Sequence, residues 1–274
     1  MNALAIKNFL AAGGFQSIRL YDINSSNNPI INFEGVSKNV TSIGFQEDGH
    51  FMFTGSEDCR VRIWDLNCSQ PVCKRMFDCR MPVNSVCLHP NQVEVAICTS
   101  AGSIYLWDIK SDNNEQLLPE MNASLNCIDI SPNGKYLAAI NNKGSCYVWD
   151  LYSDGKDQLS KTNAKLKFIA HTRYGLKCKF SPDSSLIVTT GGDGTARIYK
   201  TDDDFKLYRE LRIPAEKFWM WDCEFTNDSS RLFTASSDGI GRLWKIETKT
   251  IEREYSGHSK ALTALAFKDG CTKA

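Results

Sequence analysis

Residues 40–66 read VTSIGFQEDGHFMFTGSEDCRVRIWDL. This stretch holds three short apolar segments, which are separated by a polar turn and a Ser-Glu-Asp turn and which end in Trp-Asp. Short apolar segments bounded by Gly, Asp and Ser are typical of antiparallel strands. The same order of signals returns in residues 125–151 and 176–200, and no segment shows a helical period. The sequence therefore predicts an all-β fold built from an internal repeat.

The repeats end in aromatic residues at a nearly constant spacing. The intervals between successive aromatic residues are 43, 43, 42, 50 and 45 residues. The six positions are Tyr21, Trp64, Trp107, Trp149, Tyr199 and Trp244. A period of about 40–45 residues that ends in Trp-Asp is the signature of WD-repeat β-propellers, which the chain resembles. We therefore expect residues 1–274 to form a single WD-repeat propeller domain.

Counting strands predicts six complete four-stranded blades. The first blade starts with an innermost strand in residues 3–6, and the sixth closes with an outer strand in residues 251–257. Residues 261–267 (ALTALAF) then form an orphan innermost strand of a truncated seventh blade. This count favours a shortened isoform or gene model of a seven-bladed parent. A six-bladed ring with residues 261–267 as a loose tail is the alternative, and the count leaves open whether the ring closes.

Polar residues at fixed positions of the repeat predict a hydrogen-bond network inside the blades. In such propellers the set comprises a His before the innermost strand, a Ser or Thr on the second strand, an Asp in the next turn and the terminal Trp. Three aspartates precede a terminal aromatic residue by six positions: Asp58 before Trp64, Asp193 before Tyr199 and Asp238 before Trp244. Only one of these repeats also keeps the His, as His171. We interpret His171 and Asp193 as a structural pair that holds a turn, rather than as a catalytic dyad.

Composition argues against several classes of function. The chain has 32 basic and 32 acidic residues and no run of like charge, so we expect no nucleic-acid partner and no direct membrane insertion. Most of its 11 cysteines fall in apolar strand patterns, and none of its four histidines pairs with them at zinc-site spacing. We find no nucleophile elbow, carboxylate pair or Cys–His arrangement. We therefore expect no enzyme activity, no metal and no cofactor.

Beyond the generic repeat, several stretches of the chain resemble one family of propellers. They include AHTRYGLKCKFSPDSS (residues 170–185), WMWDCEF (219–225) and EREYSGHSKALTALAF (252–267). The family is the small WD-repeat subunit of the target-of-rapamycin kinase complexes, also called G-protein-β-subunit-like protein. The likeness runs from Met1 to about Lys268, and it begins inside the second of the family's seven repeats. Residues 269–274 (DGCTKA) match nothing in the family.

The resemblance implies a non-enzymatic scaffold subunit. It implies binding to the C-terminal lobe of the kinase domain of target of rapamycin and, through the kinase, association with the other subunits of both complexes. It also implies support of kinase activity and complex assembly in nutrient and growth-factor signalling, in the cytoplasm and at the lysosomal surface. A generic WD-repeat adaptor, such as a substrate receptor of a ubiquitin ligase, is the alternative.

One mouth of the propeller is the candidate partner-binding site. When the innermost strands are aligned on their last apolar residue, two columns of residues mark the strand entrance, where loops carry function. Most repeats place small or polar residues there, including Asn2, Asn39, Asn84 and Asn126. The sixth repeat instead places Trp219 and Trp221, and Tyr174 of the fifth repeat shares the column of Trp219. We expect these three aromatic residues to contact a partner, with local loop packing and a small-molecule pocket as the alternatives.

Overall fold

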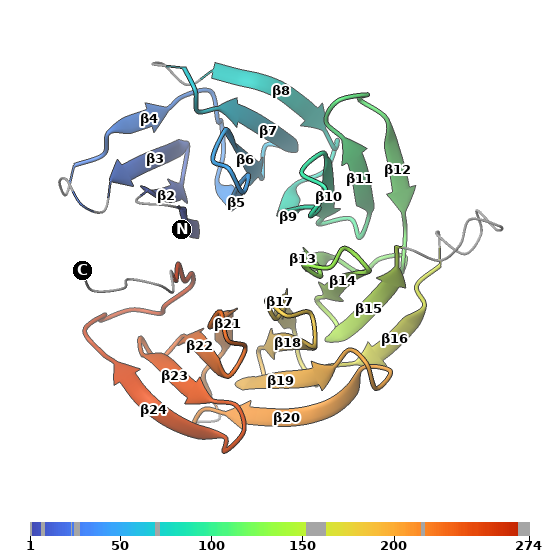
Figure 1. The fold of residues 1–274 in the computed structure, drawn as a ribbon, viewed down its shortest axis with the longest axis vertical. Coiled ribbons are helices and arrows are strands. Elements are labelled where there is room, and N and C mark those ends of the chain that lie inside the picture. Colours follow the sequence, from blue (N-terminus) through green and yellow to red (C-terminus); the bar gives the residue numbers. More distant parts are fainter. Residues whose placement is uncertain are drawn as a thin grey trace.

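The computed structural model describes residues 2–6 (backbone only), 9–22, 24, 28–68, 72–151, 163–214 and 217–267. In this part of the chain, 24 strands form six antiparallel sheets of four strands each. Figure 1 shows the sheets as blades around a central axis, each with its first strand next to the axis and its last strand at the rim. No helix of the described residues is long and apolar enough to cross a bilayer. The prediction of an all-β propeller with six complete blades is confirmed.

The blades follow one another in chain order. The first comprises β1 (Asn2–Ile6), β2 (Phe9–Gly14), β3 (Ser17–Asp22) and β4 (Ile31–Phe33), and the second β5 (Val40–Phe45), β6 (Phe51–Ser56), β7 (Arg60–Asp65) and β8 (Val72–Asp78). The third comprises β9 (Val83–Leu88), β10 (Glu94–Thr99), β11 (Ile104–Asp108) and β12 (Asn114–Leu117), and the fourth β13 (Leu125–Ile130), β14 (Tyr136–Asn141), β15 (Ser145–Asp150) and β16 (Leu166–Ile169). The fifth comprises β17 (Gly175–Phe180), β18 (Leu186–Gly191), β19 (Thr195–Lys200) and β20 (Lys206–Arg212), and the sixth β21 (Met220–Phe225), β22 (Arg231–Ser236), β23 (Gly241–Lys245) and β24 (Thr250–Tyr255).

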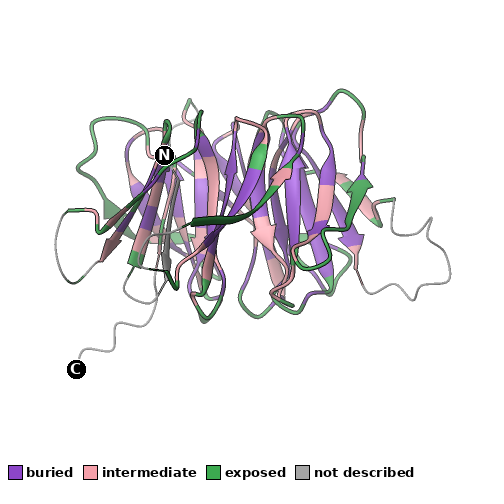
Figure 2. Cartoon of the chain, turned by 90° about the horizontal axis from the view of Figure 1, so that it is seen from above, coloured by how far each residue is buried: buried purple, intermediate pink, exposed green. Residues whose placement is uncertain are grey.

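The hydrophobic core lies between neighbouring blades, because each sheet has two faces that only its neighbours cover. Figure 2 shows the buried residues within the strands and most exposed residues in the turns and outer strands. At three contacts between blades, a Phe on the outer strand of one blade packs on the terminal aromatic residue of the next. The pairs are Phe33 with Trp64 (ring centroids 5.4 Å apart), Phe77 with Trp107 (5.4 Å) and Phe168 with Tyr199 (4.7 Å). The aromatic residue that defines the repeat thus serves the contact with the preceding blade.

Residues 261–267 form no strand, so the prediction of an orphan innermost strand is wrong in this respect. They follow the sixth blade, in the interval between the last and the first blade (Figure 1). The Leu262 amide donates to the Ser236 carbonyl (3.1 Å), and the Leu265 amide donates to the Asp222 carboxylate (2.8 Å). A strand needs a ladder of backbone hydrogen bonds to a second strand, and no sheet of the described residues includes this segment. The predicted unmatched tail, residues 269–274, lies outside the described residues.

A buried polar network in the fifth blade holds the turn between β18 and β19. His171 is buried, and its Nδ1 lies 2.9 Å from Asp193 Oδ1 while its Nε2 lies 2.9 Å from Thr189 Oγ1. Asp193 also accepts hydrogen bonds from Thr195 Oγ1 (2.7 Å) and Arg197 Nη1 (3.2 Å). Burial by itself would raise the pKa of Asp193, but the hydrogen bonds it accepts, above all from His171, hold that pKa well below its usual range. These contacts suit a structural pair, since every polar atom of the His171 ring faces a protein partner.

Arginine completes the corresponding network in two other blades. The Arg62 guanidinium lies 2.8 Å from Asp58, and the Arg242 guanidinium lies 2.8 Å from Asp238. Arg62 and Arg242 are both buried, and each stands four residues after its Asp, as Arg197 does in the fifth blade. The predicted set of residues did not include these arginines, although their constant spacing is visible in the sequence.

We predict that Asp193→Asn lowers the free energy of unfolding at neutral pH by about 2–4 kcal/mol, because it removes the carboxylate that His171 and Arg197 share. Asp193 binds its proton at a lower pH in the folded chain than in the unfolded chain, where the pKa is about 3.9. Its stabilisation is therefore complete above about pH 5 and declines as the pH falls below about 4. The stability difference between the two proteins should shrink over that range, which urea titrations followed by tryptophan fluorescence will measure.

Asp203→Asn is the matched control, because the Asp203 side chain is 61% exposed in the turn before β20. This change should alter the free energy of unfolding by less than about 0.5 kcal/mol. Equal stability of the two variants at neutral pH would contradict a structural role for the network around His171.

Candidate partner-binding site at the propeller mouth

The innermost strands of the second to sixth blades all begin at one mouth of the propeller, which surrounds a cavity of about 890 Å³. The predicted residues that line this cavity are Asn39, Asn84, Asn126, Tyr174, Trp219 and Trp221. The side chain of Asn2 lies outside the described part of the structure. The structure therefore gathers at one place every predicted mouth residue whose side chain it describes.

Three of these residues, Tyr174, Trp219 and Trp221, form a contiguous group that we call the aromatic cluster. The ring centroids of Trp219 and Trp221 are 5.2 Å apart, and those of Tyr174 and Trp219 are 5.6 Å apart. Tyr174 is 49% exposed, and both tryptophans are partly exposed. The Trp219 amide donates to Ser237 Oγ (2.8 Å) and the Ser237 amide donates to the Trp219 carbonyl (2.9 Å), so the backbone beneath the cluster is held in place.

A β-bulge at the strand entrance positions Trp221. The pairing of β21 with β22 shifts register between Met220 and Asp222, so no residue of β22 stands opposite Trp221. Equivalent shifts in the second to fifth blades leave four other residues unopposed, namely Thr41, Asn84, Asn126 and Leu176. A bulge inserts one residue and redirects its side chain. The repeated bulge therefore presents one side chain of each of these blades at the mouth.

The polar residues at the bulge connect neighbouring blades. Thr41 Oγ1 donates to the Val83 carbonyl, Asn84 Nδ2 to the Leu125 carbonyl and Asn126 Nδ2 to the Gly175 carbonyl, each over 2.7 Å. Leu176 has no polar group to continue the series, and the indole nitrogen of Trp221 has no hydrogen-bond partner among the described residues. These inter-blade ties thus run from the second blade to the fifth and stop where the aromatic cluster begins.

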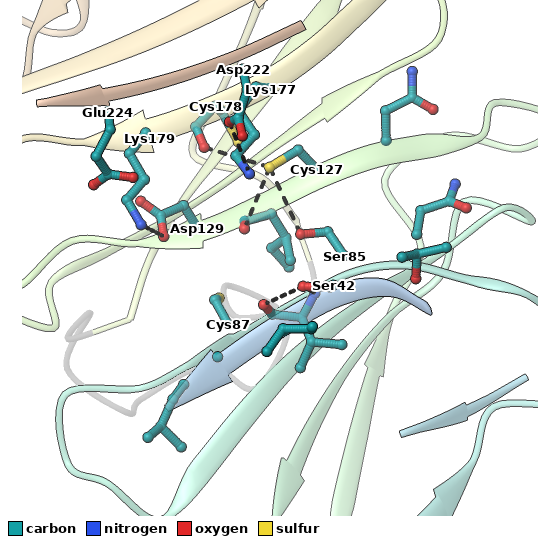
Figure 3. Close-up of a pocket in the computed structure, with 18 of the residues that line it drawn as sticks. Ser42, Ser85, Cys87, Cys127, Asp129, Lys177, Cys178, Lys179, Asp222 and Glu224 are labelled. Carbon is teal, nitrogen blue, oxygen red and sulfur yellow. Dashed lines mark hydrogen bonds and ion pairs between the residues drawn. The ribbon is translucent and has the colours of Figure 1, made fainter. Parts of the chain in front are cut away.

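Charged residues line a second cavity, of about 500 Å³, along the innermost strands (Figure 3). Lys177 Nζ lies 3.2 Å from Asp222 Oδ1, and Lys179 Nζ lies 3.8 Å from Asp129 Oδ1. The ion pairs therefore join the fifth blade to the sixth and to the fourth. The sequence analysis missed these residues, although Lys and acidic residues at alternate positions of 176–180 (LKCKF) and 221–225 (WDCEF) were the available signal.

The electrostatics of this cavity follow from burial and pairing. The charge of Asp222 raises the pKa of Lys177 well above its usual value, and Asp129 does the same for Lys179. A hydrogen bond with Cys178 lowers the pKa of the Cys127 thiol below its usual value. Among the described residues, no group of three or more His, Cys, Asp or Glu side chains is placed to hold a metal ion. The cavity thus contains oppositely charged groups that mainly satisfy one another across blades.

Comparisons with known proteins agree with this architecture. The family model "WD domain, G-beta repeat" matches residues 27–65, 71–108, 116–150, 164–200 and 208–245. "Protein LST8 homolog" of Drosophila melanogaster is 57% identical over 264 residues, which cover 96% of this chain and 83% of the relative. "Target of rapamycin complex subunit LST8" of Mus musculus is 49% identical over 279 residues, which cover 98% of this chain and 85% of the relative. The chain belongs to the LST8 family of WD-repeat proteins.

The family membership confirms the resemblance seen in the sequence. A relative in Saccharomyces cerevisiae, also named "Target of rapamycin complex subunit LST8", is 41% identical to this LST8-family chain over 265 residues. The crystal structure of the Cps50 (Swd1) beta-propeller domain of Myceliophteria thermophila has a TM-score of 0.81 and covers 97% of this chain and 89% of that domain. Its sequence identity is 15%, so it supports the propeller fold alone.

We predict that Asn126→Ala lowers the free energy of unfolding by about 1–2 kcal/mol, because the Gly175 carbonyl loses its donor between the fourth and fifth blades. Asn39→Ala is the matched control at the same mouth. Asn39 is exposed and donates a hydrogen bond to Glu57 of its own blade. Losing this hydrogen bond should lower the free energy of unfolding by less than about 0.5 kcal/mol. Urea unfolding of both variants tests the inter-blade tie, and equal stability of the two would contradict it.

Proposed function

We propose that this LST8-family chain is a non-catalytic scaffold subunit of target of rapamycin kinase complexes. In this proposal the aromatic cluster at its mouth binds the C-terminal lobe of the kinase domain. The observation that supports it most is a contiguous, partly exposed group of three aromatic rings in a chain whose relatives are named as target of rapamycin complex subunits.

The exposure of the cluster favours contact with another protein. Tyr174 leaves about half of its surface in water, which a partner would bury. Aromatic anchors of this kind contribute about 2 kcal/mol or more each when an interface covers them. The indole nitrogen of Trp221 is buried and has no hydrogen-bond partner among the described residues, so the cluster offers a partner chiefly the apolar surface of its rings. The partly exposed rings thus supply apolar area that an interface would cover.

The cluster is also held in place before any partner binds. Trp221 stands at a bulge, and the Trp219 backbone is bonded in both directions to Ser237. Side chains that are already ordered lose little conformational entropy on binding, so more of the contact energy appears as affinity. A rigid anchor on a ring of blades suits a scaffold, whose task is to hold a partner in one arrangement.

The wider role follows from the same proposal. Binding at the kinase domain supports kinase activity and complex assembly in nutrient and growth-factor signalling, and links the chain to the other subunits of both complexes. The chain is then cytoplasmic and reaches the lysosomal surface as part of the complex. A generic adaptor, such as a ubiquitin-ligase substrate receptor, would use a different partner, so identifying the partner separates the two functions.

We predict that the double change Trp219→Ala and Trp221→Ala weakens co-purification with the target of rapamycin kinase at least tenfold, because it removes two adjacent anchors. The experiment captures the kinase from cells that express tagged wild-type or variant chain and compares the kinase recovered per chain. Circular dichroism and the unfolding temperature of the purified variant establish that it is folded.

Tyr255→Ala is the matched control, because Tyr255 is 46% exposed on β24, the outer strand of the sixth blade. Kinase recovery should stay within about twofold of the wild type for this variant. Undiminished recovery by a folded double variant would rule out the cluster as the kinase contact, and recovery of a ubiquitin ligase in place of the kinase would favour the adaptor.

A further inference from the structure

A cavity of about 460 Å³ lies between the third and fourth blades, on the face opposite the mouth. It is lined by His89 and Ile130, at the ends of the innermost strands β9 and β13, whose starts are at the mouth. The rest of the lining comes from β10, β11 and β12 of the third blade, from β15 of the fourth, and from turn residues next to the strands of both blades. We call this cavity the third-blade pocket. Its volume falls in the range of about 300–1,000 Å³ that is common for ligand sites.

The third-blade pocket exists because one aromatic contact between blades is absent. Phe33, Phe77 and Phe168 each stand opposite the residue that lies three positions before the terminal aromatic residue of their blade. From that register position they pack on the terminal aromatic residue of the next blade. In the third blade the position is held by Leu117, opposite Ile104. Leu117 is smaller than Phe, and the space beside Trp149 of the fourth blade stays open.

The fifth blade shows that Leu at this position is not sufficient by itself. It also carries Leu there, as Leu211, but its outer strand has seven residues and includes Tyr208, which packs against the core between the fifth and sixth blades. The outer strand of the third blade, β12, has four residues, Asn-Glu-Gln-Leu, and no aromatic residue. The pocket therefore results from a smaller residue on a shorter and more polar strand.

Trp149, which lines the pocket, is a buried side chain with an unused donor. It is 2% exposed, and its indole nitrogen has no hydrogen-bond partner among the described residues. In other blades the donor is satisfied: Trp64 donates to Thr54, Trp244 to Thr234 and Trp107 to Asp112. Thr54 and Thr234 stand ten residues before their tryptophans, and Ala139 occupies that place in the fourth blade. A buried donor without an acceptor is rare in proteins, and here it arises because Ala139 offers no hydroxyl at the place of that Thr.

The rim of the third-blade pocket is acidic and its floor is apolar. The acidic residues of the lining are Glu94, Asp108, Glu115 and Asp150, and none of the described lining residues is Lys or Arg. Lys165, outside the lining, lies 3.7 Å from Asp150, and Asn91 donates to Glu94 (2.7 Å). Backbone amides of Ser111 and Lys110 lower the pKa of Asp108, which keeps it ionised at neutral pH. The floor consists of Ala96, Leu106, Leu117, Ile130, Trp149 and Leu151.

We propose that the third-blade pocket binds an arginine side chain, presented by an extended segment of a partner protein. An aliphatic stem suits the floor of Leu117 and Trp149, and a cationic head suits the carboxylates of the rim. The planar guanidinium favours arginine over lysine, because it bonds carboxylates with a fork of donors and stacks on an indole. This site lies on the face away from the aromatic cluster and does not depend on the proposed kinase contact.

The test uses the purified chain and a blocked probe peptide, acetyl-Gly-Ser-Leu-Arg-Leu-Ser-Gly-amide, labelled with fluorescein for anisotropy titrations. A second probe carries citrulline in place of arginine, which keeps the shape and removes the charge, and a third carries lysine. The arginine probe should bind at least tenfold more tightly than the citrulline probe and measurably more tightly than the lysine probe. Added salt should lower the affinity for the arginine probe. Equal binding of arginine and citrulline, or no binding of arginine, would overturn the proposal. Equal binding of arginine and lysine would overturn the assignment to arginine.

Leu117→Phe is the decisive variant, because it places in the pocket the ring that three other blades carry there. It should lower the affinity for the arginine probe at least tenfold. The unfolding temperature should stay the same or rise, since Phe fills an existing space. The second variant combines Glu94→Gln with Glu115→Gln, and both residues are exposed. This variant should also lower the affinity for the arginine probe at least tenfold. Wild-type affinity in either folded variant would count against the pocket.

The mouth variant with Trp219→Ala and Trp221→Ala is the matched control for this site. It should bind the arginine probe as the wild type does, because the aromatic cluster is on the other face. Conversely, the Leu117→Phe chain should still recover the kinase, so failure of one proposal is distinguishable from failure of the other. Loss of arginine binding in the mouth variant would place the arginine site at the mouth and overturn the proposal.

Discussion

Each blade depends on its neighbours, because a sheet of four short strands has two apolar faces and no core of its own. The contact between the first two blades illustrates this. Ile18 and Leu20 of the first blade share one buried cluster with Met52 and Trp64 of the second. In the second, third and fifth blades the aromatic residue that ends the repeat lies at such a contact, where a Phe on the outer strand of the preceding blade packs on it. Packing between consecutive blades is therefore the interaction on which the rest of the molecule rests.

The β-bulge at the strand entrance adds a polar component to this packing. In the second, third and fourth blades the bulge residue is Thr or Asn, and it ties its blade to the backbone of the next. In the fifth and sixth blades the same position holds Leu176 and Trp221, which make no such tie. One backbone feature thus serves stability in one half of the mouth and presents an apolar surface in the other half.

Departures from the repeat mark both surfaces that we assign to partners. At the mouth, large aromatic residues replace the small polar residues of sister blades. On the opposite face, Leu117 replaces Phe, which leaves a space beside Trp149, and Ala139 replaces Thr, which leaves the indole nitrogen of Trp149 without a hydrogen-bond partner among the described residues. Local rules that the other blades obey are broken at these places, and such breaks are expected at functional sites.

The sequence by itself determined the number of blades, the order of their strands and the candidates at the mouth. These properties follow from spacing and alternation, which are local and recur in every repeat. It also placed Trp219 and Tyr174 in one column, and the structure puts their rings 5.6 Å apart.

Only the tertiary structure decided what depends on neighbouring blades. The bulge at Trp221, the tie from Asn126 to Gly175 and the ion pair of Lys177 with Asp222 each join residues from different strands, and the last two join different blades. The absence of a ladder at residues 261–267 and the space beside Trp149 also depend on what a neighbour offers. A repeat pattern specifies each blade separately. These features instead depend on strand register and on the sizes of side chains that touch although they lie tens of residues apart in the sequence.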